Sequence, residues 1–251
     1  MKHQTRMKLA LAAATILFPA ASAFAADLIP VYESPEVPVE VGSGWYLRGD
    51  IGYGWGDKAG KINYNVNSGG IDYPGDTRHP DFKDNFNFGA GVGYRFTDYL
   101  RSDITVDGFR SRLSATDPWS AGDVTGTANF SAISLMANGY VDLGTYSGFT
   151  PYVGAGLGYS YLSFSDLAAV LPNGSQETIS GSSDWRFTYA LMAGVAYDIT
   201  KNMKLDVGYK YRNIDGGDMF SGTASNGDIV TGSNGNLSTH EVRVGLRYEI
   251  W

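Results

Sequence analysis

The sequence predicts an all-β fold, an eight-stranded antiparallel up-and-down transmembrane β-barrel. Stretches of about ten residues alternate apolar and polar side chains, as strands do when one face meets lipid and the other a polar lumen. The connections between them are alternately very short and very long, like the periplasmic turns and external loops of outer-membrane barrels. The predicted strands are 45–55, 85–96, 100–109, 131–143, 151–163, 185–199, 203–213 and 240–250.

The first 25 residues have the order of a secretory signal peptide. Three basic residues precede the apolar run 9–18, and the small-residue motif Ala23-Phe24-Ala25 follows it. The run is shorter than the roughly 20 residues that a membrane-spanning helix needs. We therefore exclude residues 1–25 from the fold.

Residues 26–43 are rich in proline and acidic residues and predict an extended periplasmic leader before the barrel, which we place at 44–251. Of the 19 lysines and arginines, three lie in the signal peptide, which leaves 16 against 26 acidic residues, a net charge of −10. This charge argues against nucleic acid as a partner. Cysteine is absent, which excludes disulfides, thiolate metal sites and cysteine nucleophiles.

The first two strands and the last two keep the alternation throughout. In 45–55, Trp45 and Leu47 face opposite to Arg48 and Asp50. The middle of the chain is less regular, because Phe109, Met136 and Tyr140 fall on the polar face. Either a β-bulge or an aromatic plug in the lumen would explain these three residues.

A soluble lipocalin-like barrel would show the same alternation with its apolar face inward. The interior of an eight-stranded barrel is only just wide enough for side chains. Because the apolar face is bulky and the charged face is rich in glycine, we expect the apolar face to meet lipid. The connections 56–84, 111–130, 164–184 and 214–239 are then the external loops.

Closure of the barrel is required, because hydrocarbon offers no partner to an unpaired strand edge. The last strand must therefore pair with the first. Aromatic residues near the strand ends predict two girdles at the membrane interfaces. These lipid-interface aromatics are Trp45, Trp55, Tyr94, Phe96, Tyr159, Trp185, Tyr197, Tyr211 and Tyr248.

The charged face predicts an ion-pair network that fills the lumen. Such networks mostly satisfy buried charges and fix strand register; the alternative is a narrow path for ions. The predicted members are Arg48, Asp50, Arg95, Arg101, Asp103, Asp107, Arg186, Lys204, Asp206, Lys210, Arg212, Glu241, Arg243, Arg247 and Glu249.

We predict no catalytic residue, and the mature chain holds only two histidines, His79 and His240. A lipid hydrolase could use Ser238 and His240, which share one strand face, with an acid from Asp184 or Asp215. A rim histidine that is hydrogen-bonded to the loops is the favoured interpretation.

A haem or metal site in the first long loop could draw on a histidine, two tyrosines and an acid. No pair of these residues has a recognisable ligand spacing, so we predict no metal site and no cofactor. The residues concerned are Tyr64, Asp72, Tyr73 and His79.

Several motifs resemble those of the small alpha-proteobacterial outer-membrane barrels, which are OmpA/OmpX-like eight-stranded proteins. The resemblance rests on residues 26–30 (ADLIP), 44–53 (GWYLRGDIGY), 89–96 (GAGVGYRF), 151–159 (PYVGAGLGY) and 244–248 (VGLRY). It implies an abundant surface protein that stabilises the envelope, and some members are described as haemin-binding or immune-recognised. The family usually ends in an aromatic residue in register with the lipid face, whereas here Ile250 is in register and Trp251 lies one beyond.

We therefore expect an integral protein of the cell outer membrane that serves envelope integrity and surface display through its long loops. The expected partners are outer-membrane lipid and lipopolysaccharide, the barrel-assembly machinery during insertion, and a host or haemin ligand at the loops. The alternatives are a small porin-like diffusion channel and haemin or host-ligand binding by the loops.

Overall fold

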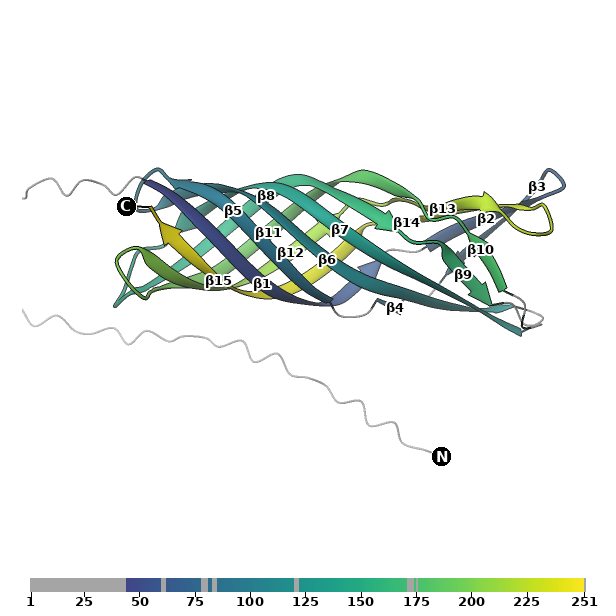
Figure 1. The fold of residues 1–251 in the computed structure, drawn as a ribbon, viewed down its shortest axis with the longest axis horizontal. Helices are drawn as coiled ribbons and strands as arrows, with labels where there is room; N and C mark the ends of the chain where they lie inside the picture. The colour runs from purple at the N-terminus through teal and green to yellow at the C-terminus, as the bar shows by residue number, and fades with distance from the viewer. Residues whose placement is uncertain are drawn as a thin grey trace, which may run out of the picture. The chain divides into compact units, whose positions relative to one another are not determined.

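The computed structural model describes residues 44–59, 62–77, 81–82, 85–119, 122–170, 174 and 176–250 (Figure 1). The predicted signal peptide and leader, His79 and Trp251 lie outside these residues. A search of the described residues finds no helix with the length and apolar character needed to cross a membrane.

Eight antiparallel strands close into a barrel, which confirms the predicted fold class. Their spatial order is β7-β8-β11-β12-β15-β1-β5-β6, and β6 pairs again with β7. The closing ladder between β15 and β1 runs from Tyr46↔Glu249 to Ala59↔Leu237. The strands are β1 (Gly44–Ala59), β5 (Asn85–Arg95), β6 (Leu100–Trp119), β7 (Gly122–Asp142), β8 (Phe149–Phe164), β11 (Ser183–Asp198), β12 (Met203–Ile214) and β15 (Leu237–Glu249).

The apolar face of the barrel points outward and the charged face points inward. Phe88 and Leu157 expose 62% and 61% of their surface, whereas Arg101 and Arg212 expose 1% and 0%. A soluble protein would not leave so many large apolar side chains exposed. The exterior therefore matches a wall in lipid, and the lipocalin-like alternative is wrong.

The two ends of the barrel differ, as the connection lengths predict. Three tight turns at 96–99, 143–148 and 199–202 define the turn end. The opposite, loop end carries more strand structure than we expected (Figure 1). The strands β6 and β7 continue as one hairpin to the pair Trp119↔Gly122, so much of the predicted loop 111–130 is strand.

A second, four-stranded sheet lies at the loop end in the order β13-β14-β2-β3. It joins the first long connection to the last, because β14 pairs with β2 from Ile229↔Asn67 to Asn234↔Ile62. The short strands β4, β9 and β10 extend the barrel sheet instead. The added strands are β2 (Ile62–Ser68), β3 (Ile71–Thr77), β4 (Asp81–Phe82), β9 (Leu167–Val170), β10 (Gln176–Ile179), β13 (Gly217–Thr223) and β14 (Ile229–Asn234).

An apolar core fills the loop end of the barrel and joins it to the second sheet. Phe130 is 5.8 Å from Phe109 and 5.5 Å from Phe164, measured between ring centroids. The β6–β7 register is continuous through Phe109, so a lumen plug rather than a bulge accounts for this residue. The buried members of this loop-end core are Ile62, Phe109, Phe130, Ala132, Leu162, Phe164, Ile179, Ile214, Met219, Phe220 and Leu237.

Replacement of Gly158 by valine is expected to prevent barrel closure. Gly158 of β8 pairs with Met136 of β7, and a Cβ there would collide with the Leu135 carbonyl oxygen. Gly158→Val should therefore lose the heat-dependent mobility shift that a closed barrel shows on a detergent gel. Gly139→Val is the matched control, since nothing lies within 4 Å of a Cβ at Gly139. Equal shifts in both variants would contradict the close approach of β7 and β8.

Candidate functional site

Asp103 is the centre of the lumen network nearer the turn end. Its carboxylate lies 3.1 Å from Arg48 Nη1 and accepts hydrogen bonds from the Tyr46 hydroxyl at 3.0 Å and from Asn138 Nδ2 at 2.7 Å. Arg48 also pairs with Asp50 at 3.0 Å. This buried carboxylate thus ties three strands, β1, β6 and β7, together across the lumen.

A second cluster lies further toward the loop end. Asp107 pairs with Lys210 Nζ at 2.9 Å and with Arg212 Nη2 at 2.6 Å, and Arg212 also reaches Glu241 at 2.8 Å. All four side chains are 6% exposed or less. Two cations and two carboxylates therefore neutralise each other in a region with little water.

Aromatic rings and hydroxyl groups complete the lumen. The Arg101 guanidinium lies 4.0 Å from the Tyr140 ring centroid and 4.8 Å from that of Tyr152, and it pairs with Asp142 at 3.0 Å. Such cation–π contacts let a buried arginine replace part of its lost hydration. The Tyr152 hydroxyl donates to Asp206 at 2.5 Å.

Most of the predicted network lies together in the lumen, where two of its members, Arg95 and Glu249, pair with each other. Arg247 is 3.9 Å from Glu249. Lys204 and Arg186 lie toward the two ends of the barrel, where Lys204 pairs with Asp198 and Arg186 pairs with Asp184.

Arg243 departs from the prediction. Within the described residues it forms no ion pair and donates to the Met192 sulfur at 3.6 Å. Tyr46, Tyr152 and Asp142 are also buried in the lumen, although they were not among the predicted residues. Tyr46 shares a face with Arg48, so the alternation itself could have identified it.

The predicted interface aromatics lie on the outer wall at both ends of the barrel. Trp45 is 52% exposed and packs against Tyr94 with ring centroids 5.3 Å apart. At the loop end, Trp185 is 61% exposed and lies 5.3 Å from the Tyr161 ring. Tyr94 and Tyr211 are half-buried, and the other seven predicted residues are exposed.

The geometry around His240 does not assemble a hydrolase. His240 Nδ1 lies 2.5 Å from the Tyr209 hydroxyl, whereas Ser238 accepts from Asn213 at 2.8 Å. Within the described residues, Ser238 and His240 are not hydrogen-bonded to each other, and no carboxylate orients the imidazole. The ring stacks at 6.5 Å on Trp55, so its neighbours are wall aromatics rather than loops.

The residues considered for haemin do not converge. Tyr64 packs against the loop-end core, whereas Tyr73 is 55% exposed. Asp72 accepts hydrogen bonds from Asn65 and Asn67 at 2.9 and 2.8 Å, and these two amides hold the pKa of Asp72 below its usual value. Among the described residues no cluster of three metal-ligating side chains is found.

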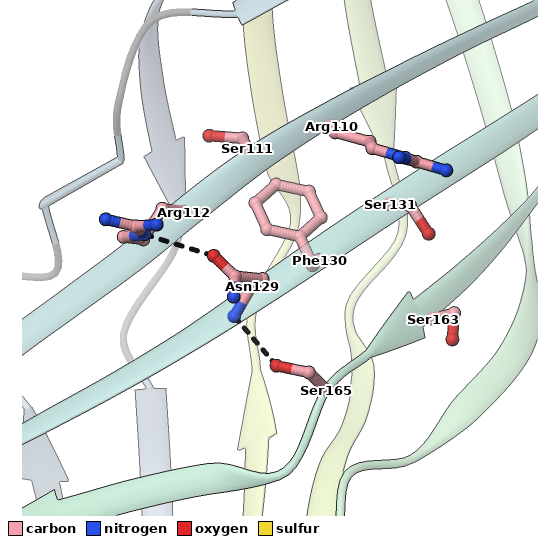
Figure 2. A pocket seen from close by; sticks show the side chains of 8 residues that line it. All are labelled: Arg110, Ser111, Arg112, Asn129, Phe130, Ser131, Ser163 and Ser165. Atoms are coloured by element: carbon pink, nitrogen blue, oxygen red, sulfur yellow. Dashed lines mark hydrogen bonds between the residues drawn. The ribbon is translucent and has the colours of Figure 1, made fainter.

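A pocket of about 770 Å³ lies on the outer wall above the loop-end aromatics, and Figure 2 shows its lining. Two arginines of β6, Arg110 and Arg112, project beside serines of β7 and β8. Arg112 Nε donates to Asn129 Oδ1 at 3.1 Å, and the Asn129 backbone N–H donates to Ser165 Oγ at 2.9 Å. The predicted strand ended at Phe109, so that Arg110 lay outside it and Arg112 fell in the predicted loop 111–130.

Comparison with known proteins agrees with this geometry. The model of the outer membrane protein beta-barrel domain matches residues 10–249. An uncharacterized protein of Brucella suis biovar 1 is 36% identical over 91% of this chain and 93% of its own length. A putative adhesin of Rickettsia conorii is 26% identical over 82% of each chain. The crystal structure of the outer membrane protein OprG from Pseudomonas aeruginosa shares the fold, with a TM-score of 0.52 and 17% identity over 83% of this chain and 96% of that chain.

Replacement of Asp107 by asparagine is expected to lower the free energy of unfolding by about 3–5 kcal/mol, because Lys210 loses its buried counter-charge. Urea unfolding in detergent micelles, followed by tryptophan fluorescence, measures this loss. Asp198→Asn is the control: its side chain is 34% exposed, so the loss should stay under about 1 kcal/mol. Similar losses in the two variants would contradict the assignment of Asp107 to a dry cluster.

Proposed function

Because the chain belongs to the outer membrane protein β-barrel family, we propose that it serves envelope integrity and surface display as a closed barrel of the cell outer membrane. The observation that carries this proposal is the loop-end core, which is shared by the barrel and the second sheet. It fills the mouth of the barrel and also anchors the external strands. The display surface is then a folded structure rather than a set of independent loops.

The display surface offers apolar side chains to a partner. Ile71 and Tyr73 of β3 and Ile229 of β14 expose 60%, 55% and 51% of their surface on the second sheet. Exposed apolar groups on an ordered surface are typical of protein contact sites. The relative named as a putative adhesin supports contact with another surface as the use of this sheet.

Two layers of packed side chains in the lumen, one of ion pairs and one of aromatic rings, argue against the diffusion channel. A solute in the lumen would have to pass the ion pairs around Asp107 and then the rings of Phe109 and Phe130. Both layers would have to be displaced, and each stabilises the fold. Haemin binding gains no support from the described residues, because Tyr64 and Tyr73 do not converge on one site.

Lipid is the partner that the exterior supports best. The exposed apolar side chains of all eight barrel strands would lie against outer-membrane lipid, with the aromatics of the two ends at its interfaces. Recognition by the barrel-assembly machinery during insertion stays a prediction, since Trp251 lies outside the described residues.

Planar-bilayer recording tests the closed lumen. The purified, folded protein should give no discrete conductance steps, because the two packed layers block the lumen. A diffusion porin reconstituted in the same lipid serves as the positive control. Reproducible steps from this protein would favour the channel instead.

Labelling of intact cells tests surface display. Antibodies against residues 62–77, which form β2 and β3, should label intact cells. Antibodies against the turn 199–202 should label only permeabilised cells, because short turns face the periplasm. The reverse pattern would place the second sheet in the periplasm and overturn its proposed role in display.

A further inference from the structure

On four neighbouring strands of the outer wall, the outward side chains change from apolar to polar at the same level of the barrel. The register pairs Gly108, Ile133, Tyr161 and Trp185 across β6, β7, β8 and β11. Two residues further toward the loop end, the outward positions of the same four strands are polar. They are Arg110, Ser131, Ser163 and Ser183, again paired in register.

This step marks the level of the membrane interface on this side of the barrel. Tyr161 and Trp185 pack on each other at the last apolar level, where amphipathic rings prefer to lie. Ile133 beside them is 55% exposed and needs hydrocarbon around it. The next outward residues, including Arg110, therefore meet lipid head groups.

The pocket of Figure 2 occupies this level and is basic. Arg110 and Arg112 lie two residues apart on β6, so both side chains project from the outer face. Within the described residues, no acidic side chain forms a salt bridge with either arginine. Among the described residues Asn129 takes only the Nε of Arg112, which leaves the Nη groups of Arg112 for a ligand. Figure 2 shows the guanidinium groups of Arg110 and Arg112 on opposite sides of the pocket.

Hydroxyl groups supply further donors around the two guanidinium groups. Ser131 of β7 and Ser163 of β8 line the same pocket beside the arginines (Figure 2). Ser165, just after β8, lines it too, but its hydroxyl already donates to the Asp166 carbonyl oxygen at 3.5 Å. Ser163 already accepts a hydrogen bond from Ser183 at 2.9 Å, which leaves its own hydroxyl hydrogen for a ligand. The wall behind them is closed by Phe130, which is 2% exposed.

We propose that this pocket binds a phosphate group of lipopolysaccharide in the outer leaflet. Two guanidinium groups match the charge of a phosphate monoester and can bind its oxygens in pairs. The pocket continues directly from the lipid-facing wall, so its occupant reaches it from within the membrane. A lipid that carries phosphate at the interface meets both conditions, whereas a soluble protein partner does not.

Native mass spectrometry of the folded protein, titrated with lipopolysaccharide in detergent micelles, tests this proposal. Arg110→Gln and Arg112→Gln should each weaken binding about tenfold, because each removes a charge-assisted hydrogen bond. Lys201→Gln is the matched control, since it removes one exposed positive charge from a turn at the opposite end. The heat-dependent gel shift should be unchanged in all three, because these side chains are exposed.

Dephosphorylated lipopolysaccharide and inorganic phosphate identify the ligand. The dephosphorylated lipid should bind the wild type and the two arginine variants equally and weakly. Inorganic phosphate alone should bind far more weakly than the lipid, since it lacks contact with the wall. Unchanged binding in the arginine variants, an equal loss in Lys201→Gln, or phosphate that binds as tightly as the lipid would each overturn the proposal. Ser131→Ala is a second test variant that leaves the charge of the pocket unchanged, and it should also weaken binding of lipopolysaccharide.

Discussion

The need to pair every backbone N–H and C=O group in hydrocarbon is the constraint on which this structure depends. It forces β15 to meet β1 and closes the sheet on itself. Closure in turn places one face of each strand in a lumen too narrow for bulk water. Each charge on that face must then find a partner inside the protein, as Arg48 and Asp103 do.

Two kinds of packing fill the lumen, ion pairs toward the turn end and aromatic rings toward the loop end. Along β6 the inward residues run from Arg101 through Asp103 and Asp107 to Phe109, so charge gives way to aromatic packing toward the loop end. The charged part specifies register, since ion pairs such as Arg48–Asp103 and Lys210–Asp107 join different strands. The aromatic part resembles the core of a soluble protein, and it allows polar external strands to fold on top of a membrane protein.

The barrel strands and most lumen residues could be predicted because lipid imposes a period of two on the sequence. The period of two is lost outside the membrane, where no lipid lies against the strands. The strands β2, β3, β13 and β14 have solvent or a shared core beside them, so their polar, glycine-rich sequences do not alternate in a readable way. Arg110 and Arg112 were missed because the outward side chains of β6 become polar at that level, although the strand itself continues through them. Partner choice within the lumen, such as Arg101 with Asp142, depends on cross-barrel distances that no local pattern contains.

The pairing of β14 with β2 has a mechanical consequence. The chain begins its barrel with β1 and ends it with β15, and the ladder between these strands is the seam at which the cylinder could be pulled open. β2 follows β1 and β14 precedes β15, so their own ladder extends this seam beyond the bilayer. Two ladders therefore hold this seam, β1–β15 in lipid and β2–β14 in water. Lateral opening of the barrel has to break the hydrogen bonds of both.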